Sequence, residues 1–569
     1  MTAEPLTAEL SSAVRNWIAR DPDPATRAEL EALAASADAG DGAAVADLTS
    51  RFSGPLMFGT AGLRAAVGAG ESRMNRAVVI RATAGLAAFL TERVGERPVV
   101  VVGCDARHGS ADFAADAAAV LAAAGCRAIR LPAQLPTPVV AYAVRELGAD
   151  AGVMVTASHN PPADNGYKVY LGGRAVDSDD ERGVQIVPPD DAHIAERIAA
   201  APPANEVPRA DADVEWAGDS LLHGYISRAA ALRGTDEPSD VRIVLTPMHG
   251  VGGETAVRVL EHAGFPNVTV VPEQARPDPE FPTVVFPNPE EPGAMDLALA
   301  LGSEDNADVV IALDPDADRC AIAIPSVSDT GNTTWRRLTG DELGALLGEH
   351  AASDPDRSGD TLACSIVSGR LLGRIAEHHG LKFRQTLTGF KWIARTPGLR
   401  FGYEEAIGYC TDPLAVRDKD GITTAVRVAS YVHRLKHSNA TVQGELDRLA
   451  RLHGLYATAP LTFRVADLEL IPQGMQRLRE NPPADLAGSP VVEYTDLSKG
   501  GPEMLPTEGV LLRTEADDRV IVRPSGTEPK LKCYLEVVLP VDGNAEIPRR
   551  SAEVRLERIN DEIRRAVGF

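Results

Sequence analysis

Short aliphatic runs alternate along most of the chain with longer segments whose apolar residues recur at helical spacing. Each run is bounded by Gly, Pro or Asp, and its unbroken apolar character is typical of a strand buried on both faces. The runs that show this most clearly are residues 97–105, 152–158, 241–247, 307–314 and 519–525. Helical patterns such as residues 111–125 lie between them. The alternation predicts βα units and mostly parallel sheets.

The first 50 residues differ, because their apolar positions recur at helical spacing on a polar background. Leu10, Val14 and Trp17 form one such series, which predicts amphipathic helices. Stretches rich in Pro and polar residues, which are typical of domain boundaries, lie at 201–213, 326–341 and 437–447. Because 569 residues suffice for about three to five domains, we expect a helical extension followed by several α/β domains.

The amino-acid composition restricts the kinds of molecule that the protein is expected to bind. The formal net charge of −24 argues against sequence-independent binding to nucleic acid or to an anionic membrane, since both need clustered Lys and Arg. An anionic small molecule stays compatible with a local cationic pocket. The six cysteines are scattered without a C-x-x-C pair, as is typical of a reducing compartment. With neither a signal-peptide pattern nor an 18-residue apolar run, we expect a cytoplasmic protein that binds neither nucleic acid nor membrane.

Ser158 lies at the end of a predicted strand, in the sequence TASHNPP (156–162). Ser, Asn and Pro are typical of turns, because the polar side chains bond to nearby backbone and Pro blocks regular structure. A serine held at a strand end can also act as a nucleophile. The stretch alone favours the turn residue, and the rest of the chain has to decide whether Ser158 is more than that.

Three acidic residues follow another predicted strand, in the sequence ALDPDADRC (312–320). Asp314, Asp316 and Asp318 alternate along the backbone, so an extended loop can direct their carboxylates to one side. Such oxygen donors suit Mg²⁺ before Ca²⁺ or Zn²⁺. The sequence does not fit the calcium loop of an EF-hand, because the sixth position holds Arg319 instead of Gly and the twelfth holds Pro325 instead of Glu. The acidic start of a helix is the structural alternative, but three carboxylates without a cation repel one another, so we expect a metal site.

Two further loops carry suitable polar groups. The sequence VRPSGTEPKLKCY (522–534) combines Arg, hydroxyls, Gly and Lys, a mixture typical of phosphate binding; a surface turn with solvated lysines is the alternative. In FGYEEAIGYC (401–410) two adjacent Glu lie between glycines and could bind sugar hydroxyls. Acids at a helix N-terminus would be the alternative there. P-loop, G-x-S-x-G and H-E-x-x-H motifs are absent from the sequence.

Taken together, these motifs resemble those of the α-D-phosphohexomutase family, the phosphoglucomutases and phosphomannomutases. The sequences GTAGLR, TASHNP, DPDADR, GYEEA and RPSGTEP stand in the family's order. The resemblance implies an α/β fold of four domains around a central cleft, with three similar mixed-sheet domains and a smaller C-terminal α+β domain. The implied bounds are 1–50 for the extension, then 51–220, 221–335, 336–450 and 451–569 for the domains with the phosphoserine, metal, sugar and phosphate loops.

The resemblance also implies roles for individual residues. Ser158 matches the phosphorylated serine, which with Asp314, Asp316 and Asp318 also provides the ligands of Mg²⁺. Arg64, Lys168 and His159 match residues beside the transferring phosphoryl group. The positions on the sugar side are Arg319, Thr388, Gly389, Glu404, Ala406 and Lys419. The loop that grips the other phosphate corresponds to Arg523, Ser525, Gly526, Thr527 and Lys530.

The implied reaction moves a phosphoryl group between C1 and C6 (or C5) of a sugar phosphate. It passes through phospho-Ser158 and a sugar bisphosphate such as glucose 1,6-bisphosphate, and glucose phosphates are the expected substrates. Many family members have Glu-x-Ser in the sugar loop, whereas this chain has Ala406. The Glu-Glu-Ala-Ile-Gly form resembles the branch that contains phosphopentomutases. Phosphomannomutase and phosphopentomutase activities therefore stay open, as does the choice between monomer and dimer.

Alternatives of another class remain at this stage. Asp314-x-Asp316 after a strand also fits a haloacid-dehalogenase-like phosphatase, with Asp314 as the nucleophile. A non-catalytic sugar-phosphate sensor could use the same fold. Nucleotide-sugar transfer through an Asp-x-Asp metal site lacks a convincing nucleotide loop.

Overall fold

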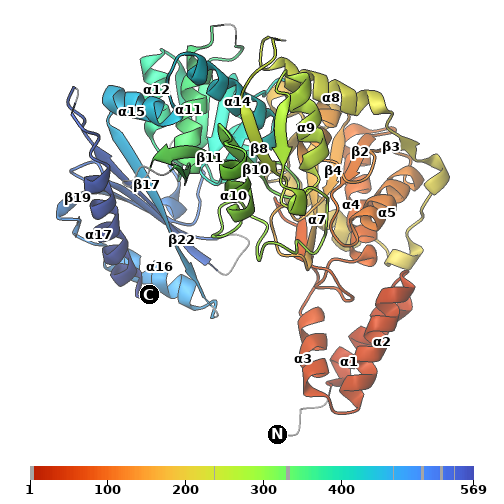
Figure 1. Cartoon of the computed structure of the whole chain (residues 1–569). Helices are drawn as coiled ribbons and strands as arrows, with labels where there is room; N and C mark the ends of the chain where they lie inside the picture. The colour runs from red at the N-terminus through yellow and green to blue at the C-terminus, as the bar shows by residue number, and fades with distance from the viewer. Residues whose placement is uncertain are drawn as a thin grey trace. The chain divides into compact units, whose positions relative to one another are not determined.

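The structure is a computed structural model that describes residues 6–235, 237–327, 333–355, 357–465, 467–501, 505–525, 530–543 and 545–569. The chain divides into two compact units (Figure 1). The first consists of Met1–Arg337 and Gly408–Ser430, and the second of Leu338–Ile407 and Tyr431–Phe569. Within the described ranges, no helix is long and apolar enough to cross a membrane.

The first unit begins with the predicted N-terminal helices. They are α1 (Ala8–Arg20), α2 (Pro24–Asp38) and α3 (Gly42–Arg51). Side chains of Thr7, Asp23 and Asp41 cap their N-termini, which satisfies backbone N–H groups that lack partners inside a helix. Arg51 Nη1 donates to the Ala69 carbonyl at 3.1 Å, and Glu29 Oε2 accepts from the Ala69 N–H at 3.2 Å. The extension thus attaches to the backbone of the next domain.

The first sheet has the order β1-β5-β4-β2-β3-β7, and β6 pairs with β5. Its strands are β1 (Leu63–Ala66), β2 (Val99–Cys104), β3 (Arg127–Arg130), β4 (Ala151–Val155), β5 (Asp164–Leu171), β6 (Val184–Gln185) and β7 (Glu215–Trp216). Its helices are α4 (Arg76–Val94), α5 (Ser110–Ala123), α6 (Thr137–Glu146) and α7 (Asp190–Ala200). The central strands β3, β2 and β4 are parallel to one another. Strand β5 pairs with β4 in antiparallel direction, and β1 pairs with β5 in antiparallel direction. The sheet is therefore mixed.

A second mixed sheet follows in the order β12-β11-β10-β8-β9. Its strands are β8 (Arg242–Thr246), β9 (Asn267–Val270), β10 (Val309–Leu313), β11 (Cys320–Val327) and β12 (Thr333–Arg337). The accompanying helices are α8 (Asp219–Ala231), α9 (Gly252–His262) and α10 (Asp296–Glu304). The strand β16 (Gly408–Cys410) and the start of α14 (Gly421–His437) complete this unit.

The second unit contains a parallel sheet and an antiparallel one. The parallel strands are β13 (Thr361–Ser365), β14 (Lys382–Thr386) and β15 (Leu399–Glu404), accompanied by α11 (Gly340–Ser353), α12 (Leu371–His378), α13 (Phe390–Ala394) and α15 (Val442–His453). The antiparallel sheet has the order β17-β22-β21-β20-β19-β18. Its elements are β17 (Leu455–Arg464), β18 (Asp485–Leu486), β19 (Ser489–Asp496), β20 (Val510–Thr514), β21 (Arg519–Pro524), β22 (Lys530–Leu539), α16 (Leu470–Glu480) and α17 (Arg549–Val567).

The predicted strands at 97–105, 152–158, 241–247 and 307–314 are confirmed as β2, β4, β8 and β10, each with at least one parallel neighbour. The run 519–525 also forms a strand, β21, but it lies in an antiparallel sheet. Expecting mostly parallel sheets was wrong for this last part, because an apolar run alone does not reveal the direction of its neighbours. Short 3₁₀ helices lie at Gly173–Ala175, Asp179–Glu181, Ala204–Glu206, Asp211–Asp213, Pro272–Gln274 and Leu497–Lys499.

Gly85 on α4 provides a test of the packing. A Cβ atom placed there would lie 2.5 Å from the backbone nitrogen of Ile198 on α7, closer than van der Waals contact allows. We expect Gly85→Ala to destabilise the protein by about 1–3 kcal/mol through overpacking, although Ala favours helices by about 1 kcal/mol over Gly. The measurement is the midpoint of thermal unfolding. Gly444→Ala on the exposed face of α15 is the control and should leave that midpoint unchanged or raise it; equal behaviour of both variants would contradict the packing argument.

Candidate active site

Ser158 lies on the loop between β4 and β5. Its φ of 52° is in the left-handed region, and the residue is only 3% exposed. Oγ donates a hydrogen bond to Asp314 Oδ2 at 2.8 Å and lies 3.2 Å from His159 Nδ1. The loop is a turn, as its prolines predict, and it directs the serine hydroxyl inward to a carboxylate.

The acidic triplet lies on the loop between β10 and β11, where each residue is at most 1% exposed. One carboxylate oxygen from each of Asp314, Asp316 and Asp318 lies within 4.8 Å of the others. The loop does not start a helix, so the helix-start alternative is wrong. Oδ1 of Asp316 and Oδ1 of Asp318 are buried and accept no hydrogen bond from any residue that the structure describes. Such oxygens need a cation or a donor, so these residues fit Mg²⁺.

The carboxyl groups respond differently to burial. Burial raises the pKa of Asp314 well above its usual range, and the charges of Asp316 and Asp318 raise it further. Burial also opposes ionisation of Asp316, but Lys168 outweighs it and lowers the pKa of that carboxyl. The cluster therefore needs positive charge to keep all three groups ionised.

Two lysines supply part of that charge. Lys168 on β5 has its Nζ 2.8 Å from Asp316 Oδ2 and 3.1 Å from Asp318 Oδ2. Lys419, just before α14, has its Nζ 3.2 Å from Asp318 Oδ2. Burial would lower the pKa of Lys168, but Asp316 and Asp318 raise it above its ordinary value. Lys168 is thus a permanent cation beside the carboxylates.

Arg64 and His159 flank the same loop. Arg64, on β1, donates from Nη1 to Asn160 Oδ1 at 3.1 Å. Burial lowers the pKa of His159 well below its ordinary value, and the charges of Arg319 and Arg64 lower it further. His159 is therefore a neutral imidazole near pH 7 and can accept a proton.

Arg319 lies on the same loop as the acidic triplet and contacts two of its aspartates. Its N–H donates to Asp314 Oδ1 at 2.9 Å, and its guanidinium lies 3.8 Å from Asp318 Oδ1 and 3.9 Å from Glu290 Oε2. The structure thus brings together every site residue predicted in the first unit, from four separate chain segments.

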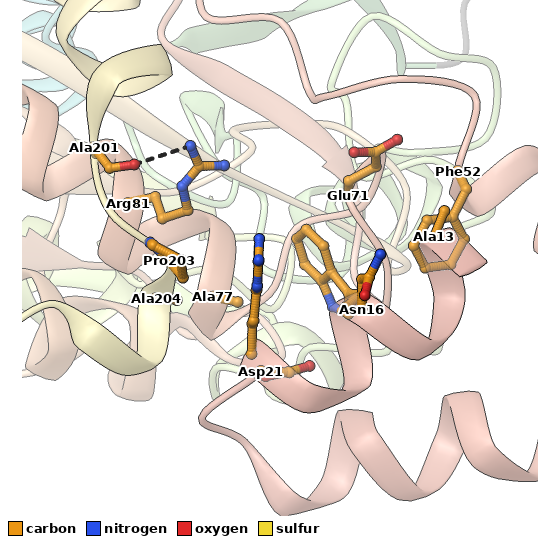
Figure 2. Close-up of a pocket in the computed structure, with 12 residues that line it drawn as sticks. Ala13, Asn16, Asp21, Phe52, Glu71, Ala77, Arg81, Ala201, Pro203 and Ala204 are labelled. Carbon is orange, nitrogen blue, oxygen red and sulfur yellow. Dashed lines mark hydrogen bonds between the residues drawn. The ribbon is translucent and has the colours of Figure 1, made fainter. Parts of the chain in front are cut away.

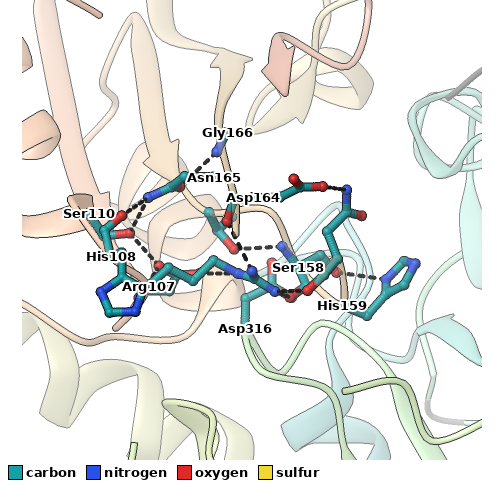
Figure 3. A network of polar contacts seen from close by, with 12 residues as sticks. Arg107, His108, Ser110, Ser158, His159, Asp164, Asn165, Gly166 and Asp316 are labelled. Carbon is teal, nitrogen blue, oxygen red and sulfur yellow. Dashed lines mark hydrogen bonds and ion pairs between the residues drawn. The ribbon is translucent and has the colours of Figure 1, made fainter. Parts of the chain in front are cut away.

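Two residues that sequence reasoning missed belong to this site. Thr137 begins α6, and its Oγ1 donates to Asp316 Oδ2 at 2.7 Å. Arg107 donates from Nη2 to the Ser158 carbonyl at 2.6 Å (Figure 3). Arg107 follows a predicted strand in the sequence GCDARHGS (103–110), which is a signal that could have found it. Thr137 has no comparable local signal.

The two adjacent glutamates of the second unit have different partners. Glu404 ends β15 and is 8% exposed. Glu405 lies in the following turn, and its Oε2 accepts from Ser365 Oγ and Ser368 Oγ, both at 2.9 Å. The two glutamates lie at the end of a strand and in the turn that follows it. The alternative that they begin a helix is therefore wrong. Ala406 follows in the same turn.

The predicted phosphate loop begins at the end of β21. Arg523 Nε is buried and donates no hydrogen bond within the described ranges. The Ser525 N–H donates to the Lys530 carbonyl at 2.8 Å, and Lys530 is buried on β22, so the alternative with solvated lysines is wrong for this residue. Gly526 and Thr527 lie outside the described residues.

The sugar and phosphate segments of this unit meet near Tyr534. Burial raises the pKa of Tyr534, Glu405 and Glu404 raise it further, and Arg523 lowers it. Since charges act over several ångströms, the two glutamates and Arg523 lie in the neighbourhood of this hydroxyl group. The other predicted sugar-side residues precede α13: Thr388 has a buried Oγ1 without a partner in the described ranges, and Gly389 has a φ of 106°.

A separate cavity of about 360 Å³ lies between the N-terminal helices and the first sheet domain (Figure 2). Its charged lining residues are Arg20, Asp21, Glu71 and Arg81. Arg81 donates from Nη2 to the carbonyl of Ala201 at 3.3 Å. None of the predicted site residues lines this cavity.

Asp420, beside Lys419, allows a test of burial through pH. Burial raises its pKa from 3.8 to about 6, although it accepts hydrogen bonds from the N–H groups of Ile422 and Thr423. Between about pH 4 and 6 the native state therefore binds more protons than the unfolded state, so stability falls as pH rises through this window. Asp420→Asn keeps a capping oxygen without this penalty.

Relative to the Asn variant, we expect the wild type to be more stable by about 1 kcal/mol at pH 5 than at pH 7.5. Calorimetric unfolding at both pH values measures this difference. Parallel pH dependence of the two proteins would show that Asp420 ionises normally.

Comparison with known proteins identifies the family. Residues 55–201, 223–327 and 339–449 match the domains described as phosphoglucomutase/phosphomannomutase, alpha/beta/alpha domains I, II and III. Residues 463–554 match the phosphoglucomutase/phosphomannomutase C-terminal domain. These matches confirm the resemblance seen in the motifs and the four-domain α/β architecture. They also exclude the haloacid-dehalogenase-like alternative.

Individual relatives cover most of the chain. A "Probable phosphomannomutase" of Haemophilus influenzae is 44% identical over 466 residues, which are 81% of this chain and 93% of that protein. A "Phosphopentomutase" of Mus musculus is 34% identical over 595 residues, with coverage of 95% and 92%. The crystal structure of a "putative phosphomannomutase" from Thermus thermophilus has the same fold, with a TM-score of 0.66 at 22% identity and coverage of 90% and 99%. The chain therefore belongs to the phosphoglucomutase/phosphomannomutase family of sugar-phosphate mutases.

Proposed function

We propose that this protein moves a phosphoryl group between C1 and C6 (or C5) of a sugar phosphate, with Ser158 as the carrier. The observation that carries the proposal is the hydrogen bond from Ser158 Oγ to Asp314, 2.8 Å long, inside a buried cluster of carboxylates and lysines. A serine hydroxyl that merely caps a turn would bond to nearby backbone instead. Phosphoryl transfer needs positioning and charge neutralisation, and this surrounding supplies both.

The reaction has two transfers of the same kind. In the first, a sugar hydroxyl attacks the phosphorus of phospho-Ser158, the bond from phosphorus to Oγ breaks, and a sugar bisphosphate forms. The hydroxyl proton passes to a base and the departing Oγ takes up a proton; His159, whose Nδ1 lies 3.2 Å from Oγ, is our candidate for this exchange. In the second, Oγ gives up its proton and attacks the other phosphate of the bisphosphate, the bond from that phosphorus to the sugar oxygen breaks, and the sugar oxygen takes a proton, which restores phospho-Ser158 and releases the isomer. Glucose 1,6-bisphosphate would thus be both intermediate and activator.

The remaining residues of the first unit would stabilise the charge that moves. Ser158, Asp314, Asp316 and Asp318 would hold Mg²⁺, which supplies a divalent positive charge to the transferring group when bound. Lys168 and Arg64 would contact the phosphoryl oxygens, as donors of charge-assisted hydrogen bonds.

Substrate recognition would use the residues that match the recognition positions of the family. On the sugar side we assign Arg319, Thr388, Gly389, Glu404, Ala406 and Lys419, and on the phosphate side Arg523, Ser525, Gly526, Thr527 and Lys530. Of the two adjacent glutamates, Glu404 is the one that the resemblance assigns to the sugar, and Glu405 accepts hydrogen bonds from Ser365 and Ser368. For the N-terminal extension we propose the bounds 1–50, and for the four domains 51–220, 221–335, 336–450 and 451–569.

Glucose phosphates are our first choice of substrate, with mannose and pentose phosphates as alternatives that the names of the relatives support. Ala406 lacks the hydroxyl that a serine would offer, and a missing hydrogen bond weakens selectivity by about 1 kcal/mol. We therefore expect modest discrimination between sugars. The six free, buried cysteines are in keeping with a cytoplasmic enzyme.

Replacing the carrier tests this function. Ser158→Ala should lower turnover of glucose 1-phosphate by a factor on the order of 1000 or more, because no oxygen remains to carry the phosphoryl group. The exposed serine Ser178 lies in the same domain, and Ser178→Ala is the matched control with unchanged turnover. A coupled assay with glucose 1-phosphate, mannose 1-phosphate and ribose 1-phosphate also ranks the substrates by kcat/KM. Full activity of Ser158→Ala, or a wild type without turnover on any of the three, would refute the proposal.

Addition of Mg²⁺ to metal-free protein tests whether the carboxylate cluster binds the metal. Mg²⁺ should raise the melting temperature of the wild type by a few degrees, because a ligand that binds only the native state stabilises it. Asp318→Asn should abolish that increase, whereas Asp38→Asn at the exposed end of α2 should retain it. Calorimetric titration of chelator-treated protein with Mg²⁺ measures the affinity directly. An equal response of all three proteins would place the metal elsewhere.

A further inference from the structure

Arg107 lies directly after β2, and its side chain is 1% exposed. Nη2 donates to the carbonyls of Ser158 and Asn160, both at 2.6 Å. Nη1 donates to the carbonyls of Pro161 and Asp164 at 2.8 and 3.0 Å. Four carbonyl groups of a single loop therefore converge on one guanidinium (Figure 3).

The Ser158 loop has a backbone conformation that its sequence does not favour. A φ of 52° at Ser158 brings Cβ close to the carbonyl oxygen, which costs roughly 1–2 kcal/mol for a residue other than Gly. The conformation persists because both sides of the residue are held. Thr156 Oγ1 accepts from the Ser158 N–H at 2.8 Å, and Arg107 binds the Ser158 carbonyl.

Arg107 is itself fixed on two sides. Its Nε lies 3.4 Å from Asp105 Oδ2, and its guanidinium carbon lies 5.0 Å from the ring centroid of Phe281. Asp105 is anchored in turn, because its Oδ1 accepts from the Arg107 N–H at 3.0 Å and from Ser110 Oγ at 2.6 Å. Asp105 directly follows β2 and Phe281 comes from the second sheet domain, so the guanidinium has little freedom to move.

We propose that Arg107 is a positioning residue for phosphoryl transfer, whose guanidinium fixes the Ser158 loop so that Oγ points at Asp314. The proposal rests on the proposed function of Ser158 as phosphoryl carrier. Arg107 binds the loop through backbone carbonyls, so it acts through Ser158. Displacement of a reacting atom by about 1 Å can lower a rate about 100-fold. Lysine would not substitute, because its ammonium cannot reproduce the planar fork that reaches separate carbonyls.

The chain offers a matched control in Arg174. Arg174 also pairs with a buried aspartate, with Nη2 2.6 Å from Asp150 Oδ2, and also donates to backbone carbonyls, those of Glu96 and Arg97. Asp150 precedes β4, whereas Asp105 follows β2, so the two pairs lie at opposite ends of parallel neighbours. Arg174→Lys therefore disturbs an Arg–Asp pair with backbone contacts in the same domain, away from Ser158, although its arginine side chain is 54% exposed.

The experiment compares Arg107→Lys with Arg174→Lys and with wild type. Two rates are measured: turnover of glucose 1-phosphate, and phosphorylation of Ser158 by glucose 1,6-bisphosphate, followed by intact mass. In the second, Oγ gains the phosphoryl group and its proton leaves with the sugar oxygen that is released. For Arg107→Lys we expect both rates to fall on the order of 10- to 100-fold, with KM changed less than about threefold. For Arg174→Lys both rates should stay near wild type, even where its melting temperature falls as far.

Other outcomes overturn the proposal or its basis separately. If Arg107→Lys phosphorylates and turns over like Arg174→Lys, or if both lose activity in proportion to their melting temperatures, Arg107 has no positioning role. A rise in KM with unchanged kcat would also overturn it, since positioning of Ser158 affects the transfer step. If the wild type itself is not phosphorylated on Ser158, the proposed function is wrong, and so is the role of Arg107 that rests on it.

Discussion

The burial of three carboxylates on one loop is the constraint on which the first unit depends. Ionised groups withdrawn from water must be paired or must bind metal, and Asp314, Asp316 and Asp318 are all but inaccessible. Lys168 reaches them from β5 and Lys419 from the segment before α14. The fold satisfies the constraint by ending β4 and β10 at the same place, so that side chains far apart in sequence can share one small volume.

Local patterns revealed the parts of this site that depend on neighbouring residues. Ser158 and the acidic triplet each follow an apolar run, and a strand that ends in polar side chains is recognisable from sequence alone. Arg107 and Thr137 escaped notice because their roles depend on contacts across 51 and 179 residues. The direction of β21 escaped for a similar reason, since its partners are chosen by the tertiary fold and not by its own apolar residues.

Glu405 shows that one residue of a motif with suitable chemistry can have a structural role. Two adjacent glutamates suggested sugar binding, yet the carboxylate of Glu405 accepts from Ser365 and Ser368. The carbonyl of Ser368 in turn accepts from Arg519 at 2.6 Å, and Arg519 begins β21, which leads to the predicted phosphate loop. The parallel and antiparallel sheets of the second unit are thereby joined through one buried polar network.

The charge balance of the cluster bears on the proposal that Ser158 carries a phosphoryl group. Without phosphate, the charges of Lys168 and Lys419 offset two of the three carboxylates, and burial keeps the pKa of Asp314 high. If Ser158 carries a phosphoryl group, as proposed, it would add a charge of about −1.5 to −2 within hydrogen-bond reach of Asp314. Like charges at that separation repel strongly in a buried site, so the proposed phosphorylated state would require further positive charge. A divalent cation on the carboxylates would supply it where it is needed, together with Arg64 beside the loop and with Arg319, whose guanidinium lies 3.8 Å from Asp318 Oδ1.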